Sequence, residues 1–369
     1  MSRTSYLTFC QPSVTKLPPL KLFFHKQKQL VPYTSEPIMR RLETIGRVCY
    51  QSADKITKDS YRSFVTKLVE RRHWSVLEHV RLLLCLPTDD LKVLLNYQQR
   101  HQLSAIVCRH YDWLTGDYVP AAATVSCSYR HLLELLELTL TGHCLTNGFQ
   151  AERDYYLAYR LYELLTDTLQ LPVPQALQRT ALMNPECNPQ TLAETHRDAI
   201  TVPPPECPED IDSPPLLQWF TPIYCDPVCR WKLLQPDSDY VTFKLVCDRG
   251  ISHELVRHRF EFSFTQESTR YVDYSKSNVK VIGDPGQLSA LQVQALKQAA
   301  EAYCQLRERG VTPQEARGVL PTATATTIYV TASKRSWQSF LRQRCSIAAH
   351  PQMRELAFQI DQQLGKLRG

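Results

Sequence analysis

Hydrophobic residues form two different patterns in the first quarter of the chain. Between Pro37 and Arg72 they recur every three or four positions, with one apolar face made by Met39, Leu42, Ile45 and Val48 and another by Phe64, Leu68 and Val69. This spacing predicts two amphipathic helices. From Val80 to Leu86 the residues are almost continuously apolar, and a run of this length predicts a strand that is buried on both faces.

A second strand is predicted from Tyr240 to Cys247, where YVTFKLVC alternates polar and apolar residues and ends at a turn over Asp248-Arg249-Gly250. The intervening residues predict two long helices, Tyr129 to Leu145 and Gln150 to Leu171. The intervening region ends in the Pro-rich run Val202 to Pro215, which predicts an extended connector. We therefore predict a mostly helical insertion over residues 87–239. It would divide a core formed by residues 1–86 and 240–369.

The C-terminal part mixes helices with one more strand. Gln287 to Arg309 predicts a helix closed by Gly310, and Thr312 to Glu315 predicts a capping box that opens a short helix ending near Pro321. The run Thr322 to Thr331 is β-prone, whereas Ser336 to Arg344 and Pro351 to Leu364 are helical in pattern. Regular βαβ alternation and a G-x-G-x-x-G motif are both absent from the sequence. The fold class expected is therefore mixed α+β (α/β), not a Rossmann fold.

The composition indicates the cellular environment of the protein and the class of ligand that it binds. The 13 cysteines are an odd number, and Cys225 and Cys229, the closest pair, have no second pair to complete a zinc site, so we predict reduced thiols and no metal. No apolar run spans a bilayer and the first residues lack a signal-peptide pattern, which predicts a cytoplasmic location and no membrane contact. The net charge of +6 suits anionic small molecules as well as polynucleotides.

Candidate chemistry concentrates in Ser252 to Tyr271, SHELVRHRFEFSFTQESTRY. If Ser252 to Arg259 is helical, Glu254 and His258 share a face, and Arg257 and Arg259 point to different sides. Arginine offers a planar fork of donors that suits phosphate groups and the carbonyls of heterocyclic rings. Two arginines with different directions are therefore able to hold two different ligands.

Two other interpretations of this cluster stay open. Charge runs are usually solvated, so a basic surface turn would explain the arginines. The interleaved aromatic residues Phe260, Phe262, Phe264 and Tyr271 instead favour the wall of a semi-buried ligand site. Aromatic and basic residues together are also typical of a stacking platform for single-stranded nucleic acid.

The motif Arg257-His258-Arg259, followed after eight residues by Ser268, resembles the RHR-x(7–8)-S motif of flavin-dependent thymidylate synthases. The sequence STRY continues this resemblance. The stretches Arg47-Val48-Cys49-Tyr50 and His73 to His79, and the region Arg317 to Leu356, also resemble the family.

The resemblance implies a mixed α/β homotetramer with active sites between subunits, where FAD and dUMP stack together. It implies the reductive methylation of dUMP to dTMP, with methylenetetrahydrofolate as the one-carbon donor, reduced FAD as the hydride donor and NADPH as the source of electrons. The partners would then be dUMP and folate, and nucleic acid would not be one. It also implies that no cysteine is required, unlike the other class of thymidylate synthase, which attacks the pyrimidine with a thiolate.

The resemblance assigns roles position by position. Flavin contacts fall on His73, Ser75, Glu78, Arg257, His258, Arg259, Gln266, Ser333, Arg335 and Ser339. Contacts with dUMP fall on Glu254, Arg257, Gln266, Glu267, Ser268, Thr269, Arg270, Arg317 and Arg344. Arg344 is also assigned the catalytic role, because it would favour negative charge on the uracil ring.

Several positions depart from the family pattern. Thr265 and Ser333 stand where asparagine or a similar small polar residue is common, Gln266 replaces a carboxylate of some members, and Ala348 replaces a histidine. The spacer has eight residues where seven are also common, and compact members lack the long insertion. Individually, Arg335 and Arg344 also fit an exposed helix face and Ser333 a helix cap. A degenerate member that binds flavin without catalysis is therefore a further alternative.

Overall fold

A computed structural model describes most of the two predicted core segments and parts of the region between them. The described residues are 6–20, 25–26, 29–30, 35–87, 107–109, 122–140, 157–158, 160–178, 232–237 and 239–365. The Pro-rich run and the cysteine pair of residues 225 and 229 lie outside these ranges.

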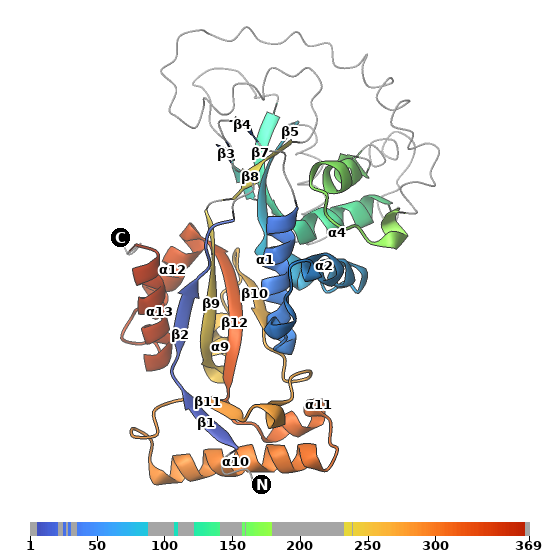
Figure 1. Cartoon of the computed structure of the whole chain (residues 1–369). Helices are drawn as coiled ribbons and strands as arrows, with labels where there is room; N and C mark the ends of the chain where they lie inside the picture. Colours follow the sequence, from blue (N-terminus) through green and yellow to red (C-terminus); the bar gives the residue numbers. More distant parts are fainter. Residues whose placement is uncertain are drawn as a thin grey trace, which may run out of the picture.

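The centre of the molecule is an antiparallel sheet of four strands in the order β10-β12-β9-β2 (Figure 1). Its strands are β2 (Ser13–Lys16), β9 (Tyr240–Asp248), β10 (Ser263–Gln266) and β12 (Ala325–Ser333). In the register, Ile328 lies opposite Leu245 and Val330 opposite Phe243, and all four side chains are fully buried. The alternation of the sequence therefore places these four residues in one apolar row on the same face of the sheet.

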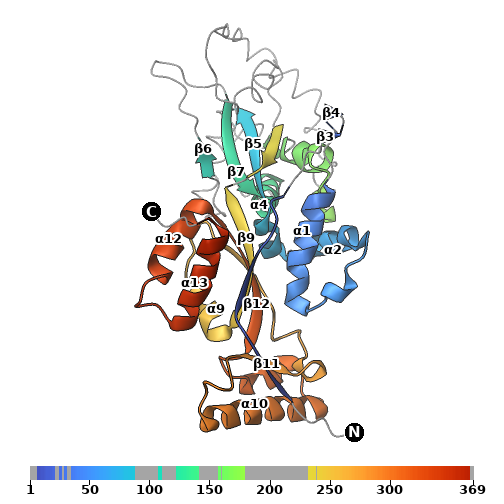
Figure 2. The same ribbon diagram turned by 60° about the vertical axis from the view of Figure 1, so that its left-hand side comes forward.

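Three helices cover one face of the central sheet (Figure 2). They are α9 (Arg249–Leu255), α12 (Lys334–Arg344) and α13 (Pro351–Gln363). Trp337 and Phe340 of α12 pack onto Phe243 and Val330 of the sheet in one apolar cluster. We call this side the α12 face.

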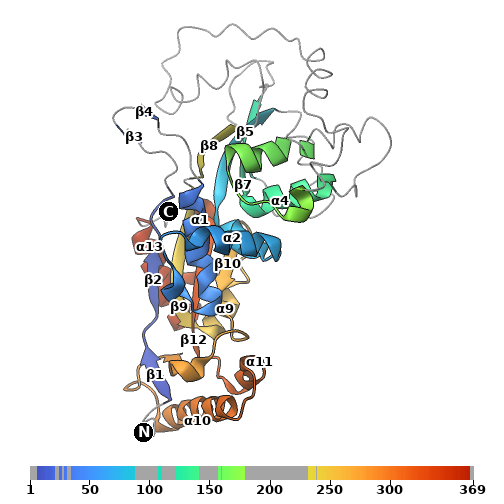
Figure 3. The same ribbon diagram turned by 45° about the vertical axis from the view of Figure 1, so that its right-hand side comes forward.

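The opposite side, which we call the α1 face, is covered by N-terminal elements (Figure 3). These are α1 (Glu36–Gly46), α2 (Ser60–Glu70) and the 3-10 helices η1 (Arg47–Tyr50), η2 (Ala53–Lys55) and η3 (Trp74–His79). Tyr329 of β12 packs into this second cluster, while its neighbours Ile328 and Val330 pack on the α12 face.

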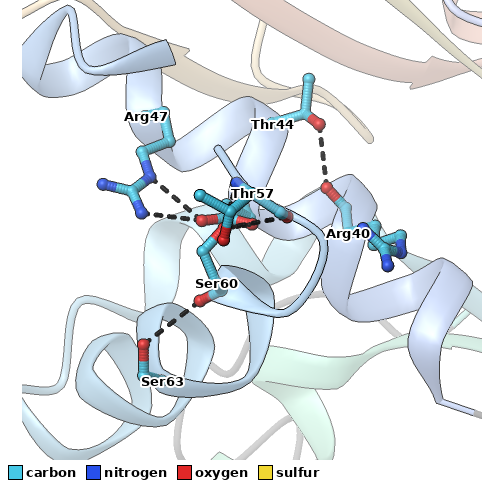
Figure 4. Close-up of polar contacts among 7 residues, drawn as sticks. Arg40, Thr44, Arg47, Thr57, Ser60 and Ser63 are labelled. Atoms are coloured by element: carbon cyan, nitrogen blue, oxygen red, sulfur yellow. Dashed lines mark hydrogen bonds and ion pairs between the residues drawn. The ribbon is translucent and has the colours of Figure 1, made fainter. Parts of the chain in front are cut away.

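A buried carboxylate joins α1 to α2 and η1 (Figure 4). Glu43, only 1% exposed, accepts hydrogen bonds from Arg47 Nη2 at 2.7 Å and from Ser60 Oγ at 3.0 Å. The guanidinium of Arg47 also lies 4.4 Å from the ring centroid of Phe64 in α2. These contacts fix the start of η1 against both helices.

A second antiparallel sheet lies beyond the top of the central one, in the order β6-β7-β5-β8 (Figure 1). It contains β5 (Arg81–Pro87), β6 (Val107–Arg109), β7 (Ala122–Ser128) and β8 (Lys232–Pro236). The helix α4 (Tyr129–Leu140) and the π-helical turn η4 (Leu164–Thr168) pack into the same apolar cluster as α1 and α2.

At the other end, α10 (Ala290–Glu308) packs on the parallel pair β1 (Leu7–Cys10) and β11 (Val279–Ile282). The short elements η7 (Tyr274–Lys276), α11 (Pro313–Ala316) and η8 (Arg317–Val319) adjoin it. Two-residue strands β3 (His25–Lys26) and β4 (Gln29–Leu30) complete the described elements. Within the described ranges, no helix combines the length and apolar character needed to cross a bilayer.

The expected mixed α+β fold is confirmed, as are the helices around Met39 and Phe64, the strands, and the C-terminal helices. Two details were wrong. Asp248-Arg249-Gly250 is not a turn, because the Asp248 side chain accepts a hydrogen bond from Ile251 N and caps α9. The helix expected from Ser252 to Arg259 ends at Leu255, so the RHR motif lies in the turn and loop that follow.

The region expected to be a helical insertion contains strands as well as helices where it is described. The strand β5 crosses the expected boundary after residue 86, and it pairs with β7 and β8 from the region beyond. The division into 1–86, 87–239 and 240–369 stays a prediction.

Candidate active site

A cavity of ≈ 430 Å³ opens on the α1 face. Its lining combines aromatic, basic and hydroxyl groups from segments far apart in the chain: Gly46, Cys49, Tyr50, Leu68, Arg72, His73, Trp74, Ser75, Val76, Arg130, Ser268 and Tyr271. The structure thus brings His73 and Ser75, expected to contact flavin, together with Ser268, expected to contact dUMP.

The segment after α2 directs His73 and Ser75 outwards. His73 N donates to Leu68 O at 2.9 Å, and Trp74 Nε1 donates to Val69 O at 3.0 Å. Trp74 is buried and His73 and Ser75 are exposed, so the alternation of the sequence places its polar members in the cavity wall.

A buried network holds the loop that begins at Ser268. Ser268 N donates to Cys49 O at 3.2 Å, which ties the loop to η1. Glu267 is 5% exposed; its two carboxylate oxygens accept from Tyr274 Oη at 2.5 Å and from Gln51 Nε2 at 2.8 Å. Both oxygens of Glu267 therefore have partners inside the protein, and its visible role is to order the loop.

Glu78 is held by a residue that sequence analysis missed. Arg130, at the start of α4, lies 2.5 Å from Glu78 Oε1 through Nη1 and 2.5 Å from Glu134 Oε1 through Nε. Arg130 lines the cavity, whereas Glu78 is not among the lining residues. Nothing in the local sequence distinguishes Arg130 from the other charged residues on helices. Tyr271, expected in the wall of a ligand site, and Tyr50, the last residue of a stretch that resembles the family, both line the cavity.

Beside the cavity, the Ser268 loop carries Arg270 and is contacted by Arg317. Arg317 Nη1 lies 3.3 Å from Thr269 Oγ1, and Arg270 Nε donates to Gln314 Oε1 at 2.9 Å. Both arginines are exposed, and neither has a carboxylate partner among the residues described. Unpaired guanidinium groups next to a hydroxyl suit a phosphate group.

A second group of expected site residues lies on the α12 face. Arg344 donates through Nη1 to Glu254 Oε2 and through Nε to His258 Nε2, both at 3.0 Å. Because His258 Nε2 accepts, it carries no proton; burial first, and the charge of Arg344 second, lower the pKa of His258. Although α9 ends before His258, the turn therefore still brings Glu254 and His258 to one guanidinium.

The remaining residues of this group offer further donors. Arg257, Arg259 and Arg335 are exposed and have no ion-pair partner within the described part of the chain. Ser339 is also exposed on α12. Ser333 is 5% exposed; its Oγ accepts from Ser336 N at 3.1 Å and bonds to the carboxylate of Glu261, so its hydroxyl caps α12.

Gln266 and Thr265 connect the two faces through the edge strand β10. Gln266 Nε2 donates to Ser252 Oγ at 2.9 Å and Thr326 Oγ1 at 3.1 Å, beneath α9. Thr265 Oγ1 lies 2.9 Å from Nε2 of the buried His79 on the α1 face. The departure at Thr265 therefore concerns a buried contact between strand and helix. Ala348 is exposed in the loop after α12.

Within the described ranges, no group of three or more His, Cys, Asp or Glu side chains is placed to hold an ion. The donors that are present, guanidinium groups, hydroxyls and amides, suit anionic and carbonyl-rich organic molecules.

Residues 239–367 match the family model described as "Thymidylate synthase complementing protein". These residues belong to the flavin-dependent thymidylate synthase family. The matched region covers about a third of the chain and contains the RHR motif, the Ser268 loop and Arg344. The segments Arg47 to Tyr50 and His73 to His79 lie outside it.

Named relatives of this family are similar over the same share of the chain. A flavin-dependent thymidylate synthase of Mycobacteroides abscessus is 36% identical over 137 residues, covering 32% of this chain and 54% of that protein. One from Pyrobaculum aerophilum is 35% identical over 119 residues, covering 32% and 46%. The chain thus spans about half the length of these relatives.

Two solved structures are similar to about a third of this chain. The UMP/dUMP methylase PolB from Streptomyces cacaoi, bound with 5-Br dUMP, is 25% identical and covers 35% of this chain and 67% of that chain, with a TM-score of 0.29. The flavin-dependent thymidylate synthase ThyX from Helicobacter pylori, complexed with FAD and dUMP, is 26% identical and covers 33% and 66%, with a TM-score of 0.28.

Proposed function

We propose that this protein is a flavin-dependent thymidylate synthase that methylates dUMP to dTMP, using methylenetetrahydrofolate, FAD and NADPH. The observation that carries the proposal is the pair of 3.0 Å hydrogen bonds from Arg344 to Glu254 and His258. They join the catalytic arginine expected from the resemblance to the two motifs expected to bind nucleotide and flavin. An exposed helix face or a basic surface turn would not require this convergence.

The donors on the α12 face fit FAD by their chemistry. Arg257, Arg259 and Arg335 offer unpaired planar forks for its phosphates and ring carbonyls, and Ser339 adds a hydroxyl. His73 and Ser75 offer further polar contacts in the cavity of the α1 face. When bound in its reduced form, FAD supplies the hydride that completes the methyl group.

The roles that we propose for the residues that bind dUMP follow from the negative charge of its phosphate and of the reacting uracil ring. Arg270 and Arg317 hold the phosphate beside Thr269, since neither guanidinium has a carboxylate partner in the described structure. Arg344 stabilises negative charge on the uracil ring, and Glu254 and the neutral His258 orient that guanidinium. Glu267 and Gln51 keep the Ser268 loop in place.

Further parts of the proposal rest on the resemblance. Methylenetetrahydrofolate gives the one-carbon unit and NADPH gives the electrons, and the enzyme acts as a homotetramer. A cytoplasmic location accords with the free thiols of Cys10, Cys49, Cys127 and Cys247.

The test has two steps. The purified full chain should show a visible flavin spectrum after incubation with FAD, and it should release tritium from [5-³H]dUMP when methylenetetrahydrofolate and NADPH are supplied. A colourless protein that does not bind FAD even with dUMP present would contradict the proposal. Flavin binding without tritium release would indicate a degenerate family member, and salt-sensitive binding of single-stranded nucleic acid without flavin would indicate the stacking platform.

Arg344→Lys sharpens the test, because an ammonium group lacks the planar fork that reaches Glu254 and His258 together. We expect tritium release to fall by roughly 10²–10³. Arg342→Lys, on the same helix but exposed, is the matched control and should keep its rate.

A further inference from the structure

Glu261 lies in the loop after the RHR motif in an unusual conformation. Its φ of 58° is in the left-handed region, which a residue with a β-carbon rarely adopts. Such a backbone persists only where surrounding contacts hold it, and these positions gather at functional sites.

The contacts that hold Glu261 come from the start of α12. Its carboxylate accepts hydrogen bonds from Ser333 Oγ and from Ser336 Oγ, the latter at 3.1 Å. Both serines are buried, at 5% and 4% exposure. A carboxylate at the N-terminus of this eleven-residue helix also interacts favourably with the helix dipole.

Aromatic packing fixes the residue next to Glu261. The ring of Phe262 lies 5.1 Å from that of Trp337 and 5.9 Å from that of His258, measured between centroids. The loop is therefore attached to α12 through the Glu261 carboxylate and through Phe262, in addition to the hydrogen bond from Arg344 to His258. The side chains of Arg257 and Arg259, which precede Glu261, remain exposed.

We propose that Glu261 is a positioning residue that clasps the RHR loop to α12, so that Arg257 and Arg259 face the same ligand as Arg335. This inference rests on the proposed function, since it deepens the flavin site. The Glu261 carboxylate is bonded to the Ser333 and Ser336 hydroxyls and not to an arginine, so the three arginines keep no carboxylate partner in the described structure and are available to the ligand. Ser333 then contributes to the flavin site through Glu261.

The first experiment measures how firmly Glu261 holds the RHR loop on α12 in the absence of flavin. Arg257 and Arg259 are trypsin sites, so limited proteolysis of the flavin-free full chain, followed by mass spectrometry, reports how firmly the loop is held. We expect Glu261→Ala to raise the rate of cleavage after these arginines about tenfold, with Glu261→Gln and Ser336→Ala in between. Glu301→Ala, an exposed carboxylate on α10, is the control and should leave these rates unchanged.

The second experiment measures flavin binding by fluorescence titration and the visible spectrum of the bound flavin. Glu261→Ala should weaken FAD binding about tenfold and shift the spectrum, and Glu261→Gln, which keeps an oxygen acceptor, should restore most of both. Equal cleavage rates in all variants, or tighter FAD binding by Glu261→Ala, would overturn the proposal. If the wild type binds no FAD, the proposed function fails, and the cleavage rates still decide the clasp. If Glu261→Ala does not fold, the cleavage rates and FAD binding of Glu261→Gln and Ser336→Ala test the proposal.

Discussion

Cys49 lines the cavity beside Tyr50, yet its surroundings do not make it a nucleophile. Burial raises the pKa of its thiol to about 11, so the neutral thiol dominates at physiological pH. We expect Cys49→Ala to keep tritium release from dUMP within about threefold of the wild type. Loss of turnover with FAD and dUMP still bound would contradict the flavin mechanism and favour attack by a thiolate.

His79 is a buried histidine whose role is structural. Nδ1 lies 2.7 Å from Thr331 Oγ1 and Nε2 lies 2.9 Å from Thr265 Oγ1, so the ring bridges η3 to β12 and β10. Burial, and to a smaller degree the charge of Arg41, lowers the pKa of His79 to about 3. The imidazole is therefore neutral in the folded protein.

This pKa shift makes stability depend on pH in a defined direction. The folded pKa is below the unfolded value of about 6.5, so the contribution is fully present above that value and decreases as the pH falls. Between pH 7.5 and 5 we expect the wild type to lose about 2 kcal/mol of unfolding free energy more than His79→Gln, in urea titrations at both pH values. Parallel losses in the two proteins would show that His79 titrates normally in the fold.

At the residue scale, the sequence patterns identified candidate site residues. They did not identify the residues that these candidates contact in the fold. The RHR motif and Ser268 stand out in sequence, and the structure places His258 and Glu254 on Arg344, about ninety positions away. Arg130 and Gln51 gave no signal, because an ion pair or an amide contact across the fold leaves no local periodicity. The departure at Thr265 was visible, but its partner His79 was not.

At the scale of the elements, the stability of the α1 face depends on the contacts that join α1, α2 and η1. Glu43 is 1% exposed and Arg47 14% exposed in their ion pair, so Glu43→Ala leaves a largely buried guanidinium without its carboxylate. We expect the unfolding free energy to fall by about 3–5 kcal/mol, measured by urea titration with circular dichroism.

Glu36→Ala is the matched control for Glu43→Ala. Glu36 also pairs with an arginine four residues along α1, but both side chains are substantially exposed, at 46% for Glu36 and 37% for Arg40. Exposed pairs of this kind contribute little, so the control should unfold close to the wild type. A small effect of both substitutions would show that the Glu43 pair is not needed to hold η1.

The elements that sequence analysis placed well are those with strong local signals. Gly310 marked the end of α10, the capping box from Thr312 to Glu315 marked the start of α11, alternation indicated β9, and a β-prone run indicated β12. Asp248 was misassigned because Gly250 is typical of turns, whereas the aspartate caps a helix that contains this glycine. The sheet of β5, β7 and β8 was not predicted, since its strands are joined across long sequence separations that periodicity does not encode.

At the scale of the whole molecule, the expected site residues divide between two sides of one sheet. His73, Ser75 and Ser268 meet at the cavity on the α1 face, while Glu254, His258 and Arg344 meet on the α12 face. The core strands β9 and β12 separate the two clusters within one chain. This division supports the expectation that a complete site combines different faces of neighbouring subunits.

Subunit mixing tests this arrangement. Arg270→Ala impairs the loop beside the cavity and Arg344→Ala impairs the α12 face, so each variant alone should retain roughly 1% of the rate or less. If each site takes its two clusters from different chains, random mixing at equal amounts leaves both intact in about a quarter of the sites. We therefore expect tritium release near a quarter of the wild-type rate after co-refolding, together with a tetramer mass by light scattering.

The control mixes Arg344→Ala with Glu254→Ala. These residues are hydrogen-bonded to each other within one chain, so no mixture of the two variants restores an intact cluster. Recovery should then be absent, although the subunits assemble equally well. If the Arg270 and Arg344 variants also fail to rescue each other while forming mixed tetramers, each chain must build its site alone. The two clusters would then have to meet around the β10 edge, where Gln266 lies between them.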